Sequence, residues 1–192
     1  MQSDKTFTSH TGKLINVFDL RPKDIDFRDI AHHLSMICRF GGACSYHYSV
    51  ALHSLFVTEL GKLNGCSKQL QLKLLLHDSA EAYMGDIVRP IKSQYSVFAA
   101  LETEINKAIS DKFSIDLTMD ATCKKFDNLA LAFESERLLD DNNWTFHKMI
   151  NMYCVDPEDV AIFRNHGQFF LRELPTSTVK GLFVDKYLEL IK

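Results

Sequence analysis

Apolar residues recur every three to four positions along most of the chain, which is the spacing of one face of an α-helix. Ser49 and Ser67 each precede such a segment, where a serine oxygen can accept hydrogen bonds from the first backbone amides. Asp26 or Asp29 can do the same for an earlier segment. These patterns predict helices over about 26–38, 49–65, 67–85, 95–113 and 119–141, a sixth from Asp156-Pro157, and a last one from Thr176 or Ser177.

Segments without helical periodicity separate these helices. "RFGGACSYHY" (39–48) and "GDIVRPIK" (85–92) are expected to be loops, because paired glycines and an internal proline disfavour helix. The opening "TFTSHTGKLINVF" instead indicates a short hairpin turning at Thr11-Gly12. We therefore predict one all-α domain over residues 1–192, a roughly globular bundle of about seven helices with a short N-terminal hairpin.

Composition changes this picture only by excluding some classes of function. A hydrophobic share of 46%, a charged share of 24% and a formal charge of −3 are those of an ordinary globular protein. Neither a nucleic acid nor a membrane surface is an expected partner, because both usually require a strongly basic face. The N-terminus is polar, and the five cysteines include no CxxC pair. We therefore expect reduced thiols and a cytoplasmic location.

The apolar pattern changes abruptly in "LLLHDSAEAYMGDI", residues 74–87. Three leucines are followed within ten positions by His77, Asp78, Glu81 and Asp86. Glu81 lies about one helical turn beyond His77, so both would project over the same region. Burying a carboxylate without a cation costs several kcal/mol or more. The segment therefore indicates a cation site at the end of a buried helix.

Two further polar residues interrupt apolar helices. His53 lies within "VALHSLF" and Asp127 within "KKFDNLALAF". Each alone is more often a hydrogen-bonded core residue or a cap than a ligand, but the adjacent His77-Asp78 pair favours the metal interpretation. Two imidazoles and two carboxylates suit Mn²⁺, Co²⁺, Fe²⁺, Ni²⁺ or Zn²⁺ better than Mg²⁺. A metal so held lowers the pKa of water toward 7, as in metal-assisted hydrolysis.

The order His53, His77-Asp78, Asp127 resembles the H…HD…D signature of the HD-domain metal-dependent phosphohydrolases. "HDSAEAYMGDIVRPIK" is similar to the HD-x-x-E-x-x-x-G-D-x-x-x-P-x-K stretch of the YfbR-like 5′-deoxynucleotidases, and "YSVALHS" is similar to the segment around their first metal histidine. The resemblance covers roughly residues 8–140; the last fifty residues carry no matching motif.

This resemblance implies a role for each residue of the pattern. The metal ligands would be His53, His77, Asp78 and Asp127, and the catalytic carboxylates Glu81 and Asp86. It also implies that Arg39 contacts substrate phosphate. The following residue is usually Trp, which packs on the sugar, but here it is Phe40, so sugar discrimination at this position is left open. Family members assemble into dimers or larger rings, and a homo-oligomer is expected.

The overall pattern is most similar to phage-encoded members, some of which are dATP triphosphohydrolases. A triphosphate carries a charge nearer −4 than −2, so it requires more cationic contacts than a monophosphate. Lys92 and one of Lys124 or Lys125 could supply them, although each is equally compatible with a solvated helix surface. We expect hydrolysis of dATP to deoxyadenosine and triphosphate, with Zn²⁺, Co²⁺ or Mn²⁺, or Mg²⁺ carried by the triphosphate. Removal of orthophosphate from dNMPs is the alternative.

Two other interpretations belong to different classes. Cys38, Cys44, His47 and His53 form a Cys₂His₂ set on paper, which would make the protein a zinc-structured binding module. Its spacing departs from the usual zinc knuckle, and it would remove His53 from the HD pattern. A protein that senses nucleotides without cleaving them is the other alternative, and the presence of both Glu81 and Asp86 argues against it.

Overall fold

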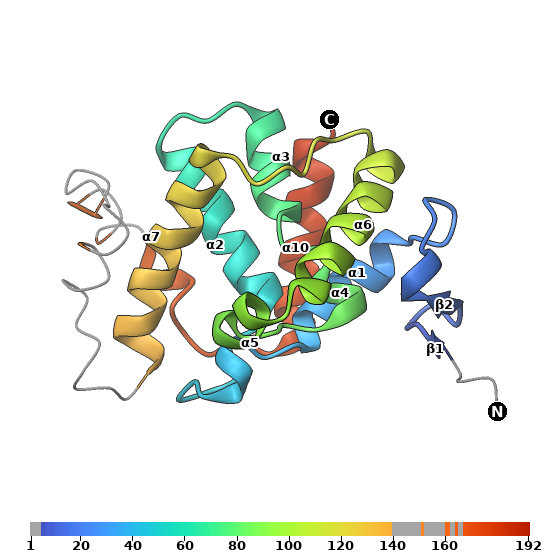
Figure 1. Ribbon diagram of the computed structural model, residues 1–192. Coiled ribbons are helices and arrows are strands. Elements are labelled where there is room, and N and C mark those ends of the chain that lie inside the picture. The colour runs from blue at the N-terminus through green and yellow to red at the C-terminus, as the bar shows by residue number, and fades with distance from the viewer. Residues whose placement is uncertain (1–4, 140–150, 152–159, 162–163, 165–166) are drawn as a thin grey trace.

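Helices make up most of the part of the chain that the computed structural model describes, which is residues 5–139, 151, 160–161, 164 and 167–192. Figure 1 shows them with a small hairpin at the N-terminal end. The α-helices are α1 (Phe27–Met36), α2 (Val50–Leu63), α3 (Lys68–Leu76), α4 (Glu81–Met84), α5 (Arg89–Gln94), α6 (Ser96–Phe113), α7 (Ala121–Leu138) and α10 (Thr176–Leu190). A mostly helical fold is therefore confirmed. The predicted helix from Asp156-Pro157 begins outside the described residues.

The predicted N-terminal hairpin is confirmed. Strand β1 (Thr6–Thr8) pairs antiparallel with β2 (Leu14–Asn16). Gly12 adopts a φ of 83° between them, a conformation that glycine adopts without steric strain. A 3₁₀ turn, η1 (Val17–Asp19), follows β2 and leads the chain toward α1.

Three polar side chains cap the helices that the sequence predicted. Ser49 accepts from the Leu52 amide at the start of α2, and Ser67 accepts from the Leu70 amide at the start of α3. Of the two candidates for α1, the N-cap is Asp26. Helix α1 ends at Met36, and Cys38 pairs with Ser49 in an isolated antiparallel bridge instead of continuing the helix.

Replacement of Ser49 by alanine is expected to lower the free energy of unfolding by about 1 kcal/mol, because the buried amide at the start of α2 loses its acceptor. Chemical denaturation of purified protein measures this difference. Ser96→Ala is the control, since Ser96 is exposed at the first position of α6 and is not the N-cap. An equal change in both variants would contradict the capping role.

The single helix predicted over 67–85 is wrong. Helix α3 ends at Leu76, and α4 begins at Glu81. Between them the backbone closes tighter turns, in which the amide of residue 79 bonds the carbonyl of Leu76 and the Glu81 amide bonds the carbonyl of Asp78, both at 3.0 Å. The His77 ring lies against the last turn of α3, with Nδ1 2.7 Å from the Leu74 carbonyl oxygen. The His77 ring thus takes the place of a backbone amide as the partner of the Leu74 carbonyl.

The loop predicted over 85–92 is also partly wrong. Helix α5 begins at Arg89 and carries Pro90 in its first turn. Proline is tolerated there because its missing N–H would have no partner within the helix. The loop predicted over 39–48 is retained, with one 3₁₀ turn, η2 (Phe40–Gly42).

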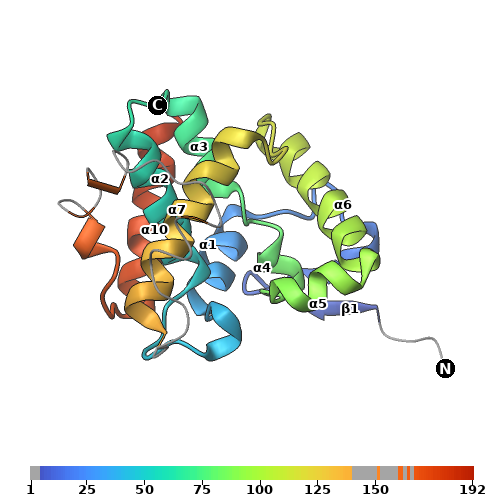
Figure 2. The same ribbon diagram turned by 60° about the vertical axis from the view of Figure 1, so that its left-hand side comes forward.

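Helix α2 lies at the centre of the helical body. All its residues from Val50 to Thr58 are buried, and it packs against α1, α3, α7 and α10. Helix α6 instead packs against α4, α5 and η1. Figure 2 shows α6 standing opposite α7, with α4 and α5 at one end of the space between them. None of the described helices is both long and apolar enough to cross a membrane.

Candidate metal centre and cleft

Three separate helical segments bring the predicted metal ligands together. His53 comes from the first turn of α2, His77 and Asp78 follow the end of α3, and Asp127 lies in α7. In the described part of the chain, His53, His77 and Asp127 each offer a ligand atom within 4.8 Å of the others, which is a group able to hold a metal ion. Both histidines are buried. The structure therefore assembles three of the four predicted ligands as a candidate metal centre.

The unused nitrogen atoms of the two histidines show that this group fits a metal. Nδ1 of His53 lies 2.6 Å from Glu134, and Nδ1 of His77 lies 2.7 Å from the Leu74 carbonyl. Nε2 of each ring is buried, with no hydrogen-bond partner in the described structure. Metal-ligating histidines use one ring nitrogen for the metal and hold the other by a hydrogen bond. Both rings have this arrangement.

The two aspartates lie beside these free nitrogens. Oδ2 of Asp78 is 3.1 Å from Nε2 of His77 and 3.5 Å from Nε2 of His53. Oδ1 of Asp127 is 3.3 Å from Nε2 of His53. Asp78 is not in the group of three, but its oxygen faces both imidazoles. The geometry is therefore compatible with all four as ligands, a mixed nitrogen and oxygen set suited to a transition metal.

The charges in this cluster depend on one another. Burial and Arg39 lower the pKa of His53, but Glu134 and Asp127 outweigh them and raise it to about 9. Burial alone would raise the pKa of Asp78, but the two histidines and Arg39 hold it below its usual range. Protons on the imidazoles thus balance the buried carboxylates. A divalent cation would perform the same electrostatic role, releasing those protons on binding.

Glu134 is a central residue of the site that the sequence interpretation missed. Its fully buried carboxylate accepts from Tyr48 at 3.0 Å, faces Nδ1 of His53, and pairs with Arg39 at 3.0 Å. The available signal was its position seven residues after Asp127, which places both on one face of α7. Acidic residues in "FESER" resemble an exposed helix face, so this signal was overlooked.

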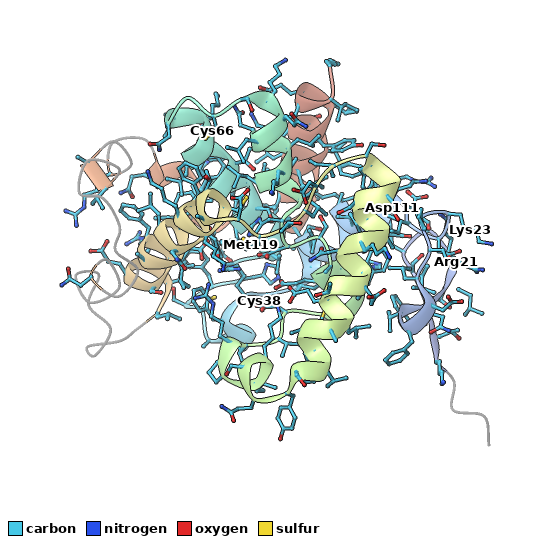
Figure 3. All side chains as sticks on the ribbon, turned by 45° about the horizontal axis from the view of Figure 1, so that its top comes forward. Arg21, Lys23, Cys38, Cys66, Asp111 and Met119 are labelled. Atoms are coloured by element: carbon cyan, nitrogen blue, oxygen red, sulfur yellow. The ribbon has the colours of Figure 1, made fainter. Side chains whose placement is uncertain are left out.

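A cleft of about 1130 Å³ opens beside the cluster. It is lined by residues of α6 and α7, and by His77, Asp78, Glu81 and Asp86. Its lining includes the candidate substrate-binding and catalytic residues Arg39, Phe40, Glu81, Asp86, Lys92 and Lys124, but not the alternative Lys125. Figure 3 shows Met119, another lining residue, between α7 and α6. The cleft thus connects the metal candidate with the expected binding residues.

Two carboxyl groups that line the cleft, Glu81 and Asp86, lie in surroundings that raise their pKa values. Burial, with Asp78 and Asp86 nearby, raises the pKa of Glu81 well above its ordinary value. Burial also raises the pKa of Asp86, and Asp78 adds to the effect. Oε2 of Glu81 is buried and has no hydrogen-bond partner in the described structure. A carboxyl group with a raised pKa and a free oxygen is suited to exchange a proton with a molecule bound in the cleft.

The cationic side chains of the cleft are held by acidic partners. The Arg39 guanidinium lies 3.7 Å from Asp78 and 5.4 Å from the Phe40 ring centre. Lys92 pairs with Glu102 of α6 at 2.7 Å. Arg89, a lining residue that the sequence interpretation did not select, contacts Asp127 at 3.1 Å. Lys107 and Lys124 also line the cleft. The cleft therefore presents several Lys and Arg side chains to a ligand, together with the carboxylates that also line it.

The Cys₂His₂ alternative is not assembled in the described structure. His53 belongs to the cluster with His77 and Asp127, and no second group of three metal-binding side chains occurs in the residues described. His47 contacts the Met36 carbonyl at 3.3 Å, and Cys44 donates to the Arg39 carbonyl. In Figure 3, Cys38 lies on the side of the cleft near η2. The geometry therefore argues against a zinc knuckle.

Comparisons with known proteins find relatives that share about a third of their residues with this chain over most of its length. It matches no family model. It is 31% identical over 137 residues to an uncharacterized protein of Rhodobacter capsulatus, covering 67% of this chain and 70% of that protein. It is 34% identical over 141 residues to the uncharacterized protein YfdR of Escherichia coli, covering 73% of this chain and 75% of YfdR. The chain therefore belongs to the same family as YfdR.

Proposed function

We propose that this protein is a metal-dependent phosphohydrolase of the HD-domain type that acts on 2′-deoxynucleotides. The observation that carries the proposal is the pair of buried Nε2 atoms, on His53 and His77, that face Asp78 and Asp127 beside a large cleft lined by both acidic and basic side chains. The similarity of "HDSAEAYMGDIVRPIK" to the 5′-deoxynucleotidase stretch supports the same chemistry.

The residues of this site have separate roles in the proposed reaction. His53, His77, Asp78 and Asp127 would hold a divalent ion, which when bound would supply positive charge for a phosphate ligand and lower the pKa of water. Glu81 and Asp86 position the attacking water and exchange protons with it and with the leaving group. Arg39 and Lys92 neutralise charge on the phosphate.

The preferred substrate in this proposal is dATP, cleaved to deoxyadenosine and triphosphate. The support is the number of cations lining one cleft, because a triphosphate carries about twice the charge of a monophosphate. These cations are Arg39, Arg89, Lys92, Lys107 and Lys124. The alternative, release of orthophosphate from dNMPs, is favoured by the acidic partners of Arg39, Arg89 and Lys92, which already neutralise part of this positive charge.

Product analysis decides between these versions. Purified protein is incubated with Co²⁺ or Mn²⁺ and each dNTP or dNMP, and the phosphorus products are separated by ion exchange. Triphosphate from dATP supports the first version. Orthophosphate from dAMP, with dATP unchanged, would replace it by the nucleotidase version. No hydrolysis of any nucleotide, with metal bound, would contradict the proposed function.

Replacement of Lys92 by alanine is expected to lower kcat/KM for dATP about tenfold, because one charge-assisted contact to phosphate is lost. The effect should appear mainly in KM. Lys112→Ala on the exposed part of α6 is the matched control. Unchanged steady-state kinetics in Lys92→Ala would remove Lys92 from the substrate site.

A further inference from the structure

A single carboxylate, Glu134, touches both halves of the proposed site. Oε1 faces Nδ1 of His53 at 2.6 Å and accepts from the Tyr48 hydroxyl at 3.0 Å. Oε2 pairs with the Arg39 guanidinium at 3.0 Å. The side chain is 0% exposed, so water does not compete for these contacts. Glu134 therefore connects a candidate metal ligand with a candidate phosphate-binding residue.

The charge of Glu134 is maintained in spite of its burial. The Arg39 guanidinium beside Oε2 supplies a compensating positive charge, and the Tyr48 hydroxyl donates to Oε1. An ionised carboxylate only accepts hydrogen bonds, so Nδ1 of His53 must carry the proton. Nε2 is then the nitrogen that is available as a ligand when the ring is neutral.

The same carboxylate restricts the position of Arg39. The guanidinium contacts Oε2 of Glu134 on one side and Oδ2 of Asp78 on the other, and it lines the cleft. An arginine held by two carboxylates loses less side-chain freedom when it binds an anion. Removing one carboxylate would leave Arg39 free to lie closer to Asp78.

We infer that Glu134 is a positioning residue that orients His53 for a divalent metal and holds Arg39 in place for phosphate. The inference rests on the proposed function for its phosphate half, while its metal half can be tested without substrate. Outer partners of metal-bound histidines typically contribute 10- to 100-fold to metal affinity. A role limited to packing would leave metal affinity unchanged in a folded variant.

The test is a Co²⁺ titration of metal-free protein, followed by visible absorption and calorimetry. Wild-type protein should bind one Co²⁺, and Glu134→Gln, which keeps the side-chain shape, should bind it at least tenfold more weakly, with an altered absorption spectrum. Glu136→Gln is the matched control, because Glu136 lies two residues further on α7 and is exposed. Thermal unfolding verifies that each variant is folded.

The outcomes separate this inference from the proposed function. Wild-type protein that binds no divalent metal would contradict the proposed function itself. Equal Co²⁺ affinity in wild type and folded Glu134→Gln would overturn the positioning role and leave the metal site intact. If Glu134→Gln does not fold, Glu134→Asp serves instead, since it keeps the charge and withdraws the oxygens from His53. Wild-type affinity in that variant would equally overturn the inference.

Discussion

Replacing Asp78 by alanine is expected to weaken divalent-metal binding more than about 100-fold, since loss of an outer partner alone costs 10- to 100-fold. Asp78 places one oxygen against both free imidazole nitrogens and also contacts Arg39. Its removal leaves two buried histidines and an arginine with less negative charge to balance them. Calorimetric titration with Co²⁺ or Mn²⁺ measures the loss.

Asp111→Ala is the control for this prediction. Asp111 is an exposed carboxylate near the end of α6 that does not line the cleft, and Figure 3 shows it on that helix. It should bind metal as wild type does. Retention of wild-type affinity in Asp78→Ala would restrict the centre to His53, His77 and Asp127, the group whose mutual distances already suit a metal.

Replacing Glu81 by glutamine is expected to lower kcat by about 10²- to 10⁴-fold while metal affinity stays within about twofold of wild type. Glu81 lines the cleft and has a buried oxygen without a hydrogen-bond partner, but it is not in the metal group. Glutamine keeps the shape and cannot exchange the proton. Single-turnover kinetics, with Glu104→Gln on exposed α6 as control, measures the effect. Equal loss of metal in Glu81→Gln would make Glu81 a ligand.

Glu81→Gln is also expected to change the stability of the metal-free protein, because the pKa of Glu81 is raised in the folded state. A carboxyl group whose pKa is higher in the folded than in the unfolded state stabilises the fold at low pH. That contribution is lost as the pH rises from the ordinary glutamate value through the raised one. Metal-free Glu81→Gln should therefore unfold at a higher temperature than wild type at pH 8, and the difference should shrink at pH 4.

Much of the fold could be predicted because local signals determine it. Serine oxygens that cap α2 and α3 act within three residues, and Gly12 in the hairpin acts within its own turn. The break after α3 was missed because it depends on the His77 ring bonding the backbone. Helix α5 was missed because Pro90 ends a helix in most positions but is tolerated in a first turn.

The candidate site was predictable where polar residues interrupt apolar helices. His53 is the clearest case, since all its neighbours along α2 are buried. Glu134 was harder to predict, because polar and apolar residues are mixed around it. Its partners His53 and Tyr48 lie 81 and 86 residues away in the chain. Such partners become evident only when α2 and α7 are packed together.

The packing of α6 has a consequence for divergence within the family. This helix contributes Glu102, Asn106 and other residues to one wall of the cleft, yet it packs against α4, α5 and η1. The candidate metal ligands come from α2, α7 and the turn after α3. Substitutions along α6 can therefore alter which molecule fits the cleft while the candidate metal ligands stay in place, so relatives that share these histidines and aspartates need not share a ligand.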